Sequence, residues 1–176
     1  MQFNVAQLLK ESVGATREYW AEGTIPSVGE LTSPLRGRVE LLRTDRGLLV
    51  KATLTANIKS TCSRCLEEFH QTMTLRLEEE FFPKVDIFTG TSLPRPEDAD
   101  AFTIDEHHIL DLTEAVRQYA LLALPMKPLC RPDCAGICSQ CGANLNQGPC
   151  RCATSPGDTR WSPLEKLLSG AKKKEN

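Results

Sequence analysis

Residues 35–82 read LRGRVELLRTDRGLLVKATLTANIKSTCSRCLEEFHQTMTLRLEEEFF, and this segment decides the fold. Its runs at 35–44 and 48–60 are rich in leucine and β-branched residues and partly alternate between apolar and polar positions, which is typical of strands with one buried face. The turn Thr44-Asp45-Arg46-Gly47 separates them and predicts a β-hairpin. A third strand is expected from about Glu68 to Phe82, where Met73, Leu75 and Leu77 alternate with polar residues.

The segments after this sheet are of three kinds. Residues 83–106 are acidic and rich in Pro, Asp, Gly and Thr, and they are expected to form a loop or a partly disordered insert. A capping-box-like start at Asp111, with Glu114 three residues later, predicts a helix over 112–123. A short second helix is expected from Ser162, with Pro163 in its first turn.

These elements predict an α+β fold with two domains. Residues 1–126 are expected to form an antiparallel sheet or partial barrel with one main helix and the insert 83–106. Residues 127–176 are expected to form a Cys-rich zinc-binding module with a short C-terminal helix. The composition, with 40% hydrophobic and 25% charged residues, is that of a globular protein.

The eight cysteines are expected to bind metal. No run approaches the roughly 20 apolar residues that cross a bilayer, and the N-terminus has no basic stretch followed by an apolar one, so the cytoplasm is the expected compartment. Disulfides are rare in that reducing compartment. The six cysteines from 130 to 152 lie in a segment with few large apolar residues, which would hardly fold without a cross-link.

The spacing of the cysteines predicts two structural Zn²⁺ ions, and one at minimum. Cys138, Cys141, Cys150 and Cys152 form a complete four-sulfur set, with Gly142 placed for a knuckle turn. The remaining four, Cys62, Cys65, Cys130 and Cys134, would close a second site that ties the sheet to the end of the helix. Redox chemistry, iron–sulfur ligation and free thiols remain alternatives for the first set, and a thioredoxin-like dithiol or free thiols for Cys62 and Cys65.

Positive charge is concentrated at the C-terminal end of the chain. The net charge is −1 over residues 1–82, −5 over 83–126 and +4 over 127–176. Basic ends favour nucleic acid, and the candidate contacts are Arg131, Arg151, Arg160 and Lys166. The alternative is that these are solvated surface charges, and eight thiolates with two Zn²⁺ would add a charge of −4.

A series of motifs resembles a known family. In chain order they are Cys62-x2-Cys65-Leu66-Glu67-Glu68-Phe69, Ile109-Leu110-Asp111-Leu112, the run Leu121 to Cys130 (LLALPMKPLC), Gly136-Ile137-Cys138-x2-Cys141-Gly142-x2-Leu145-Asn146, Cys150-x-Cys152, and Asp158-Thr159-Arg160-Trp161-x-Pro163-Leu164. From about residue 35 onward the chain resembles the bacterial YceD family, the large ribosomal RNA subunit accumulation proteins. The resemblance implies a role in accumulation or processing of 23S rRNA and in large-subunit assembly. Some members lack the C-terminal cysteine set and keep a pair that matches Cys62 and Cys65, with a His or Cys ahead of a Cys near Cys130 and Cys134, which supports the shared second site.

An enzyme is not expected. Both cysteine sets are closed and all-sulfur, whereas a catalytic zinc site keeps an open position beside an acid or base. The expected partner is 23S rRNA, its precursor or a large-subunit ribosomal protein, with neither a membrane nor a small-molecule substrate. Three classes remain: an rRNA-associated assembly factor, an adaptor that docks a ribosomal protein or nuclease, and a zinc-storage or redox-sensing protein.

Overall fold

The computed structural model describes residues 1–25, 31–94, 96 and 100–152. The chain divides into two compact units, Met1–Cys134 and Ala135–Asn176. All the helices and strands named below belong to the first unit. Residues 127–134, which the sequence analysis grouped with the zinc module, also belong to the first unit. The expected C-terminal helix at 162 lies outside the described residues.

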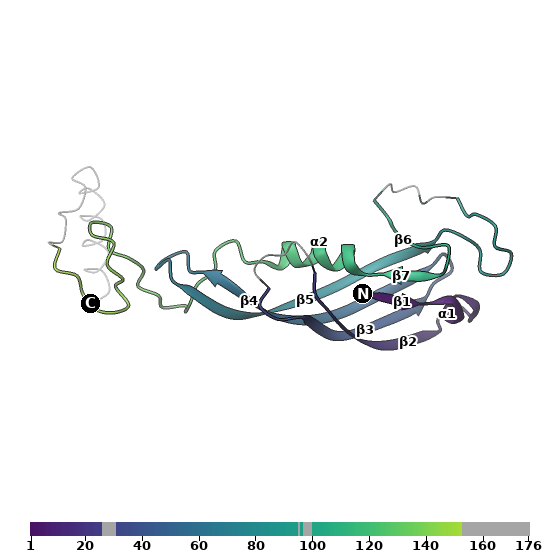
Figure 1. Cartoon of the computed structure of the whole chain (residues 1–176), viewed down its shortest axis with the longest axis horizontal. Helices are drawn as coiled ribbons and strands as arrows, with labels where there is room; N and C mark the ends of the chain where they lie inside the picture. The colour runs from purple at the N-terminus through teal and green to yellow at the C-terminus, as the bar shows by residue number, and fades with distance from the viewer. Residues whose placement is uncertain (26–30, 95, 97–99, 153–176) are drawn as a thin grey trace, which may run out of the picture. The chain divides into compact units, whose positions relative to one another are not determined.

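A five-stranded sheet forms the body of the first unit (Figure 1). Its strands, in spatial order, are β2 (Thr16–Gly23), β3 (Leu35–Arg43), β4 (Leu48–Thr61), β5 (Glu68–Pro83) and β6 (Phe102–Ile104). The three strands expected between residues 35 and 82 are confirmed. Neighbours pair antiparallel except for β5 and β6, which are parallel, so the sheet is mixed rather than purely antiparallel.

The β3–β4 hairpin turns where the sequence predicts. The Thr44 hydroxyl accepts a 2.9 Å hydrogen bond from the Gly47 N–H, and the Thr44 N–H donates to the Gly47 carbonyl at 3.1 Å. Gly47 is required by a close approach, because a Cβ there would lie 2.1 Å from the carbonyl oxygen of Phe81 on β5. The turn therefore packs directly against the neighbouring strand.

One face of the sheet carries the hydrophobic core. Alternate residues of β3, β4 and β5 are fully buried, as period-2 patterning requires. Helix α2 (Thr113–Ala123) covers this face with Ala115, Val116 and Ala120 (Figure 1). Leu8 and Leu9 of α1 (Ala6–Lys10) complete the core.

The N-terminal residues form elements that the sequence analysis did not interpret. Strand β1 (Gln2–Asn4) pairs with β7 (Ile109–Asp111) in a two-stranded sheet, and β2 pairs along its length with β3. The signal for β2 was its alternation, with Tyr19 and Ala21 turned inward between exposed neighbours.

The insert 83–106 is more ordered than expected. It contains β6 and an isolated bridge between Val85 and Ser92. Phe102 of β6 stacks on Phe81, with ring centroids 5.2 Å apart. Among the described residues, none of the helices has the length and apolar character that crossing a bilayer demands.

Candidate metal centres

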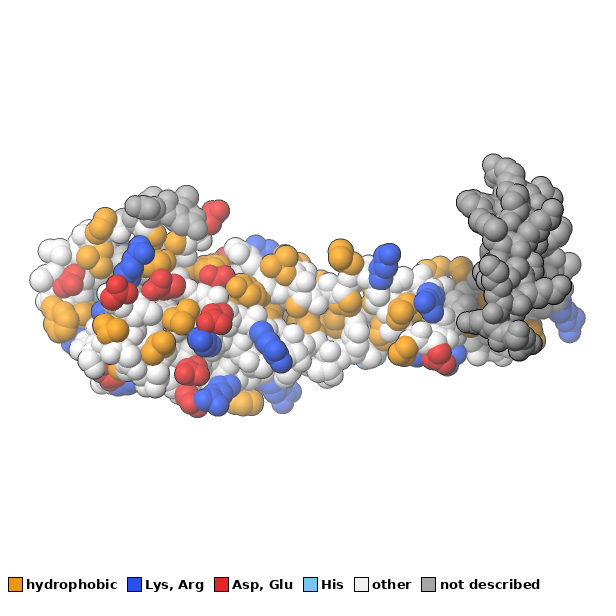
Figure 2. Space-filling model, turned by 180° about the vertical axis from the view of Figure 1, so that it is seen from behind, with side chains coloured by type: hydrophobic (Ala, Val, Ile, Leu, Met, Phe, Trp, Pro, Cys, Tyr) orange, Lys and Arg blue, Asp and Glu red, His pale blue; other side chains and the backbone are white. Residues whose placement is uncertain are grey.

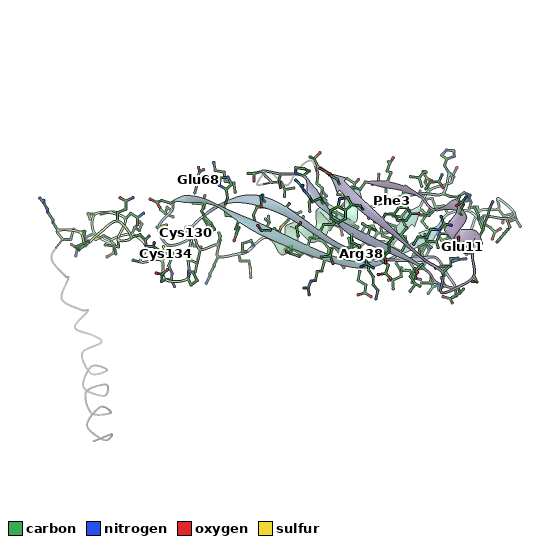
Figure 3. The ribbon with its side chains drawn as sticks, turned by 90° about the horizontal axis from the view of Figure 1, so that it is seen from below. Phe3, Glu11, Arg38, Glu68, Cys130 and Cys134 are labelled. Carbon is green, nitrogen blue, oxygen red and sulfur yellow. The ribbon has the colours of Figure 1, made fainter. Side chains whose placement is uncertain are left out.

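The structure gathers the eight cysteines into two sets of four. The sheet cluster consists of Cys62, Cys65, Cys130 and Cys134, and the C-terminal cluster consists of Cys138, Cys141, Cys150 and Cys152. Within each cluster all four sulfurs lie within 4.8 Å of one another. Figure 3 shows Cys130 and Cys134 beside the end of the first unit where Glu68 begins β5, far from Glu11 at the opposite end.

The sulfur separations of the sheet cluster fit a tetrahedral ion. The Sγ atoms of Cys62 and Cys134 are 3.8 Å apart, and those of Cys65 and Cys130 are 3.7 Å apart. A Zn–S distance of about 2.3 Å gives a tetrahedron whose sulfur–sulfur edge is about 3.8 Å. Disulfides would require about 2.05 Å. The cluster thus has the dimensions of a four-thiolate metal site.

The Cys-x2-Cys turns of the two clusters share one hydrogen-bond pattern. In the sheet cluster the Leu66 N–H donates to the Cys62 carbonyl at 2.9 Å, and the Cys62 N–H donates to the Glu67 carbonyl at 2.9 Å. In the C-terminal cluster Gly142 N–H donates to Cys138 O at 2.9 Å, and Cys138 N–H donates to Ala143 O at 2.8 Å. Two segments with different sequences form the same turn around their sulfurs.

The backbone of each turn favours a thiolate at its first cysteine. The N–H of Cys65 lowers the pKa of Cys62 to about 6, from an ordinary value of 9.0. The N–H groups of Cys141 and Gln140 likewise lower the pKa of Cys138 to about 6, and Gln140 N lies 3.4 Å from the Cys138 sulfur.

Other thiols in the clusters resist ionisation. Burial raises the pKa of Cys130 to about 12. The hydrogen bond with the Cys141 side chain raises the pKa of Cys152 to about 12. A divalent cation at the centre would favour loss of all four protons, because metal ligation requires thiolates.

Two residues inside the first Cys-x2-Cys turn hold the second half of the sheet cluster, and no sequence motif pointed to either. The N–H and hydroxyl of Ser63 each donate to the Pro128 carbonyl at 2.8 Å. The Arg64 guanidinium donates to the Cys134 carbonyl at 3.0 Å. Their position between two ligands was the only available signal. They bring the 128–134 segment to the β4–β5 turn.

The two clusters differ in burial. Cys62, Cys65 and Cys134 are buried, and Phe69 and Leu129 pack around them. In the C-terminal cluster Cys141 is exposed and its three companions are half-buried. Among described residues 135–152, Gly136 alone is buried, so this part of the second unit has no hydrophobic core of its own.

The four candidate nucleic-acid contacts are not gathered into one described surface. Arg131 lies in the first unit, where its Nε is 3.6 Å from an Asp133 carboxylate oxygen. Arg151 lies in the second unit, between two ligands of the C-terminal cluster. Arg160 and Lys166 lie outside the described residues.

A family model identifies the relatives of this chain. The model described as "Large ribosomal RNA subunit accumulation protein YceD" matches residues 50–168, which include both cysteine clusters. The chain belongs to the YceD family. The resemblance seen in the sequence motifs is thereby confirmed, and the family's description links it to large-subunit rRNA accumulation.

Curated relatives of the YceD chain come from bacteria and plants. An uncharacterized Mycobacterium tuberculosis protein is 33% identical over 129 residues, which are 69% of this chain and 56% of the relative. The large ribosomal RNA subunit accumulation protein YCED homolog 1, chloroplastic, of Arabidopsis thaliana is 26% identical over 164 residues, 81% of this chain and 51% of the relative. The chain thus spans about half the length of the curated relatives it matches. No solved structure matches it.

Proposed function

We propose that this protein is a non-catalytic factor for accumulation and processing of 23S rRNA, and hence for assembly of the large ribosomal subunit. The observation that carries the proposal is the match to the YceD family model over residues 50–168. The printed name of the Arabidopsis relative refers to the same process. The partner is 23S rRNA or its precursor, and the site of action is the cytoplasm.

Structural zinc in both clusters is part of the proposal. All eight ligands are sulfur, which suits Zn²⁺ and excludes the oxygen-preferring Mg²⁺ and Ca²⁺. Four protein ligands complete a tetrahedral shell, and closed sites of this kind are structural. That closure supports a non-catalytic role. The burial of the sheet cluster argues against zinc storage, because stored metal must exchange readily.

An adaptor that docks a ribosomal protein or nuclease is the second candidate. One observation favours it, because several apolar side chains at the C-terminal end of α2 and just after it are exposed to solvent. Leu122 is 82% exposed and Met126 is 99% exposed, with Leu121 beside them. Such exposed apolar groups are typical of protein contact sites.

Depletion of the protein in its own host tests the proposal. We expect the ratio of 23S to 16S rRNA to fall and 23S precursors to change, with recovery on complementation by the wild-type chain. Crosslinking of the tagged protein, followed by sequencing of bound RNA and proteomics, separates the two candidates. Enrichment of discrete 23S segments supports direct contact, whereas a ribosomal protein or nuclease without RNA supports the adaptor. An unchanged rRNA ratio after depletion would contradict both.

A further inference from the structure

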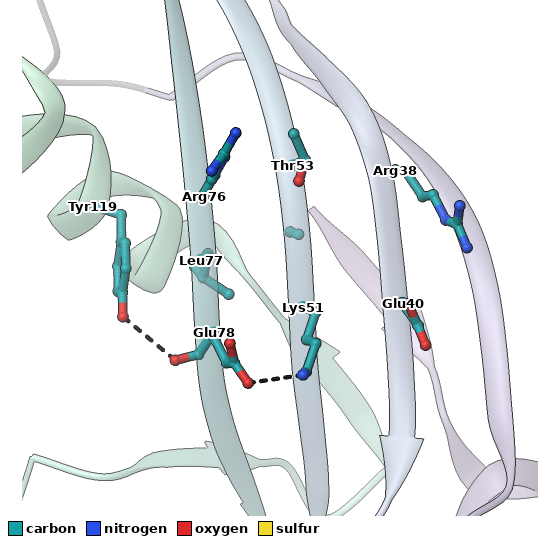
Figure 4. Close-up of a pocket in the computed structure, with 9 residues that line it drawn as sticks. Arg38, Glu40, Lys51, Thr53, Arg76, Leu77, Glu78 and Tyr119 are labelled. Atoms are coloured by element: carbon teal, nitrogen blue, oxygen red, sulfur yellow. Dashed lines mark hydrogen bonds and ion pairs between the residues drawn. The ribbon is translucent and has the colours of Figure 1, made fainter.

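The sheet has a second face, opposite the core, and an exposed tryptophan stands on it. We call this the outer face. Trp20 on β2 is 70% exposed. Register pairs it with Arg38 on β3, which pairs with Thr53 on β4, which pairs with Arg76 on β5. All four side chains are exposed, and Figure 4 shows Arg38, Thr53 and Arg76 side by side across three strands.

Charge on the outer face is divided along the strands. From the Trp20 row toward the sheet cluster, the paired strands carry four cations and two carboxylates on this face: Arg36, Arg38, Lys59, Arg76, Glu22 and Glu68. In the opposite direction they carry one cation and four carboxylates: Lys51, Glu18, Glu40, Glu78 and Glu80. In Figure 2, acidic side chains likewise gather toward the end of the first unit away from the β4–β5 turn.

Two of the four cations on this half of the outer face form ion pairs, and the other two form none among the described residues. Arg38 is bonded to Glu18, and Lys59 to Glu68 at 2.7 Å. Arg36 and Arg76 have no ion-pair partner within the ranges that the structure describes. Arg38 and Arg76 lie at one side of a hollow of about 560 Å³, whose lining also includes Glu40, Lys51 and Glu78 and Tyr119 of α2.

We propose that the basic half of the outer face binds single-stranded RNA. Trp20 offers a flat ring on which a base can stack, and Arg36 and Arg76 offer positive charge to the phosphates on either side. Thr53 and its exposed neighbour Thr74 add hydroxyls that can bond ribose or phosphate. The bases of a duplex are already stacked on one another, so the surface should prefer single strands. The inference rests on the proposed function and names its RNA-contact surface.

The chemistry around Trp20 separates RNA from a protein partner. Aromatic side chains that contact a protein partner usually lie among other apolar side chains. The cross-strand neighbours of Trp20 are Arg and Thr, and its own strand places Glu18 and Glu22 on either side on this face. The basic residues near the clusters have another task, because each Zn²⁺ with four thiolates carries a charge of −2. Arg36 and Arg76 lie on the sheet away from the clusters, and although Glu22 is opposite Arg36 in the register, the two form no ion pair.

Fluorescence anisotropy of the full-length, zinc-loaded protein with a labelled single-stranded RNA of about 10 nucleotides tests the stacking contact. Trp20→Ala should weaken binding about tenfold, and Trp20→Phe should restore most of it. Phe88→Ala is the matched control, because Phe88 is an aromatic residue 75% exposed outside the sheet. It should leave binding unchanged.

The salt dependence of the same binding tests the electrostatic contact. Arg36→Ala and Arg76→Ala should each lower the salt slope by about 0.7, the value of one single-strand phosphate contact. Arg117→Ala on α2, which covers the other face, removes the same charge and should leave the slope unchanged.

The outcomes distinguish this inference from the proposed function. Equal affinity of wild type and Trp20→Ala, or preference for duplex RNA of the same sequence, overturns the inference. If Trp20→Ala also restores 23S rRNA in depleted cells, the function stands without this surface. If depletion leaves 23S rRNA unchanged while Trp20→Ala still loses RNA binding in vitro, the proposed function fails and the surface binds another RNA. Absence of RNA binding by the wild type overturns the inference and leaves the adaptor.

Discussion

Leu66 adopts a backbone conformation that favours glycine. Its φ is +61°, and the equivalent residue of the other turn, Gly142, has a φ of +72°. A side chain with a Cβ pays about 1–2 kcal/mol in this region. Leu66 is largely exposed, so its side chain recovers little of that cost by burial. The sheet cluster is therefore built on a mildly strained turn.

Exchanging the residues of the two turns should have opposite effects. Leu66→Gly should raise the free energy of unfolding by about 0.5–1 kcal/mol, since relief of the left-handed strain exceeds the entropy cost of glycine. Gly142→Leu should destabilise the zinc-loaded second unit by about 1 kcal/mol. A Cβ at 142 meets nothing within 4 Å, so this cost is conformational. Urea unfolding of the first variant and zinc competition on the second measure these effects, and changes of the same sign in both would contradict the strain argument.

Asp111 lies just before α2, and its carboxylate accepts a hydrogen bond from the first residue of the helix. Its Oδ1 accepts a 2.8 Å bond from the Thr113 N–H, and its Oδ2 accepts a 2.9 Å bond from Gln2. Glu114, expected to complete a capping box, bonds Arg117 and Gln118 instead. Burial raises the pKa of Asp111, but the bonds from Thr113 and Gln2 outweigh it and hold the pKa at about 2, below its ordinary 3.8.

The stabilisation by Asp111 should depend on pH. Because the folded-state pKa is depressed, the stabilisation is present above pH of about 4 and is lost as the pH falls toward 2. Asp111 is 44% exposed, so the expected loss in Asp111→Ala at neutral pH is below about 1 kcal/mol. Urea unfolding of the wild type and of Asp111→Ala, at neutral and at acidic pH, gives the difference between their free energies of unfolding. This difference cancels effects that both proteins share, including metal loss in acid. A difference that grows toward low pH would refute this account.

At the scale of elements, the sheet cluster joins segments that are distant in sequence. Cys62 and Cys65 lie in the β4–β5 turn, and Cys130 and Cys134 follow α2. The chain from Leu66 to Leu129 forms the loop that metal at this cluster would close. By contrast, the C-terminal cluster closes only local loops within residues 138–152.

Replacing one ligand in each cluster should reveal this difference. Cys62→Ser should destabilise the entire first unit, by about 4 kcal/mol on a loop-closure estimate. Cys138→Ser should remove structure near 138–152 and leave the unfolding of the sheet unchanged. Far-ultraviolet circular dichroism during heating follows the sheet. Ser63→Ala removes one of the two hydrogen bonds to Pro128 but leaves every sulfur in place, so it should cost far less than Cys62→Ser. Equal and local effects of both ligand replacements would rule out the shared site.

At the scale of the whole molecule, the two units have different sources of stability. The first has a continuous core of buried aliphatic side chains contributed by β2 to β7 and both helices. The described part of the second unit buries Gly136 alone. Small units without a core usually require a metal or a disulfide.

Removal of metal should therefore act on the units unequally. With a strong chelator we expect residues 135–152 to lose their amide protection while β3, β4 and β5 keep theirs and melt at a lower temperature. Hydrogen exchange followed by mass spectrometry measures both responses, and added Zn²⁺ should reverse them. Elemental analysis should find two Zn²⁺ per chain. Complete unfolding of the sheet on chelation would contradict this account, because it would show that the hydrophobic core does not keep the sheet folded without metal.

Local patterns in the sequence predicted much of this architecture. The three central strands, the hairpin turn at Thr44 to Gly47 and helix α2 follow from alternation, turn residues and a helix-start signal. These signals concern neighbours along the chain, so no tertiary information is needed to read them. The candidate role of the cysteines as metal ligands was also evident, because Cys-x2-Cys turns carry their geometry in a few consecutive residues.

Only the tertiary structure decided which distant segments meet. The pairing of β1 with β7 and the parallel pairing of β6 with β5 join residues with weak local signals. Spacing along the chain left other uses of the cysteines open, and it gave no role to Ser63 and Arg64. The row of Trp20, Arg38 and Arg76 exists only through strand register. Such contacts depend on how separate strands align in space, which the local periodicity of each strand does not determine.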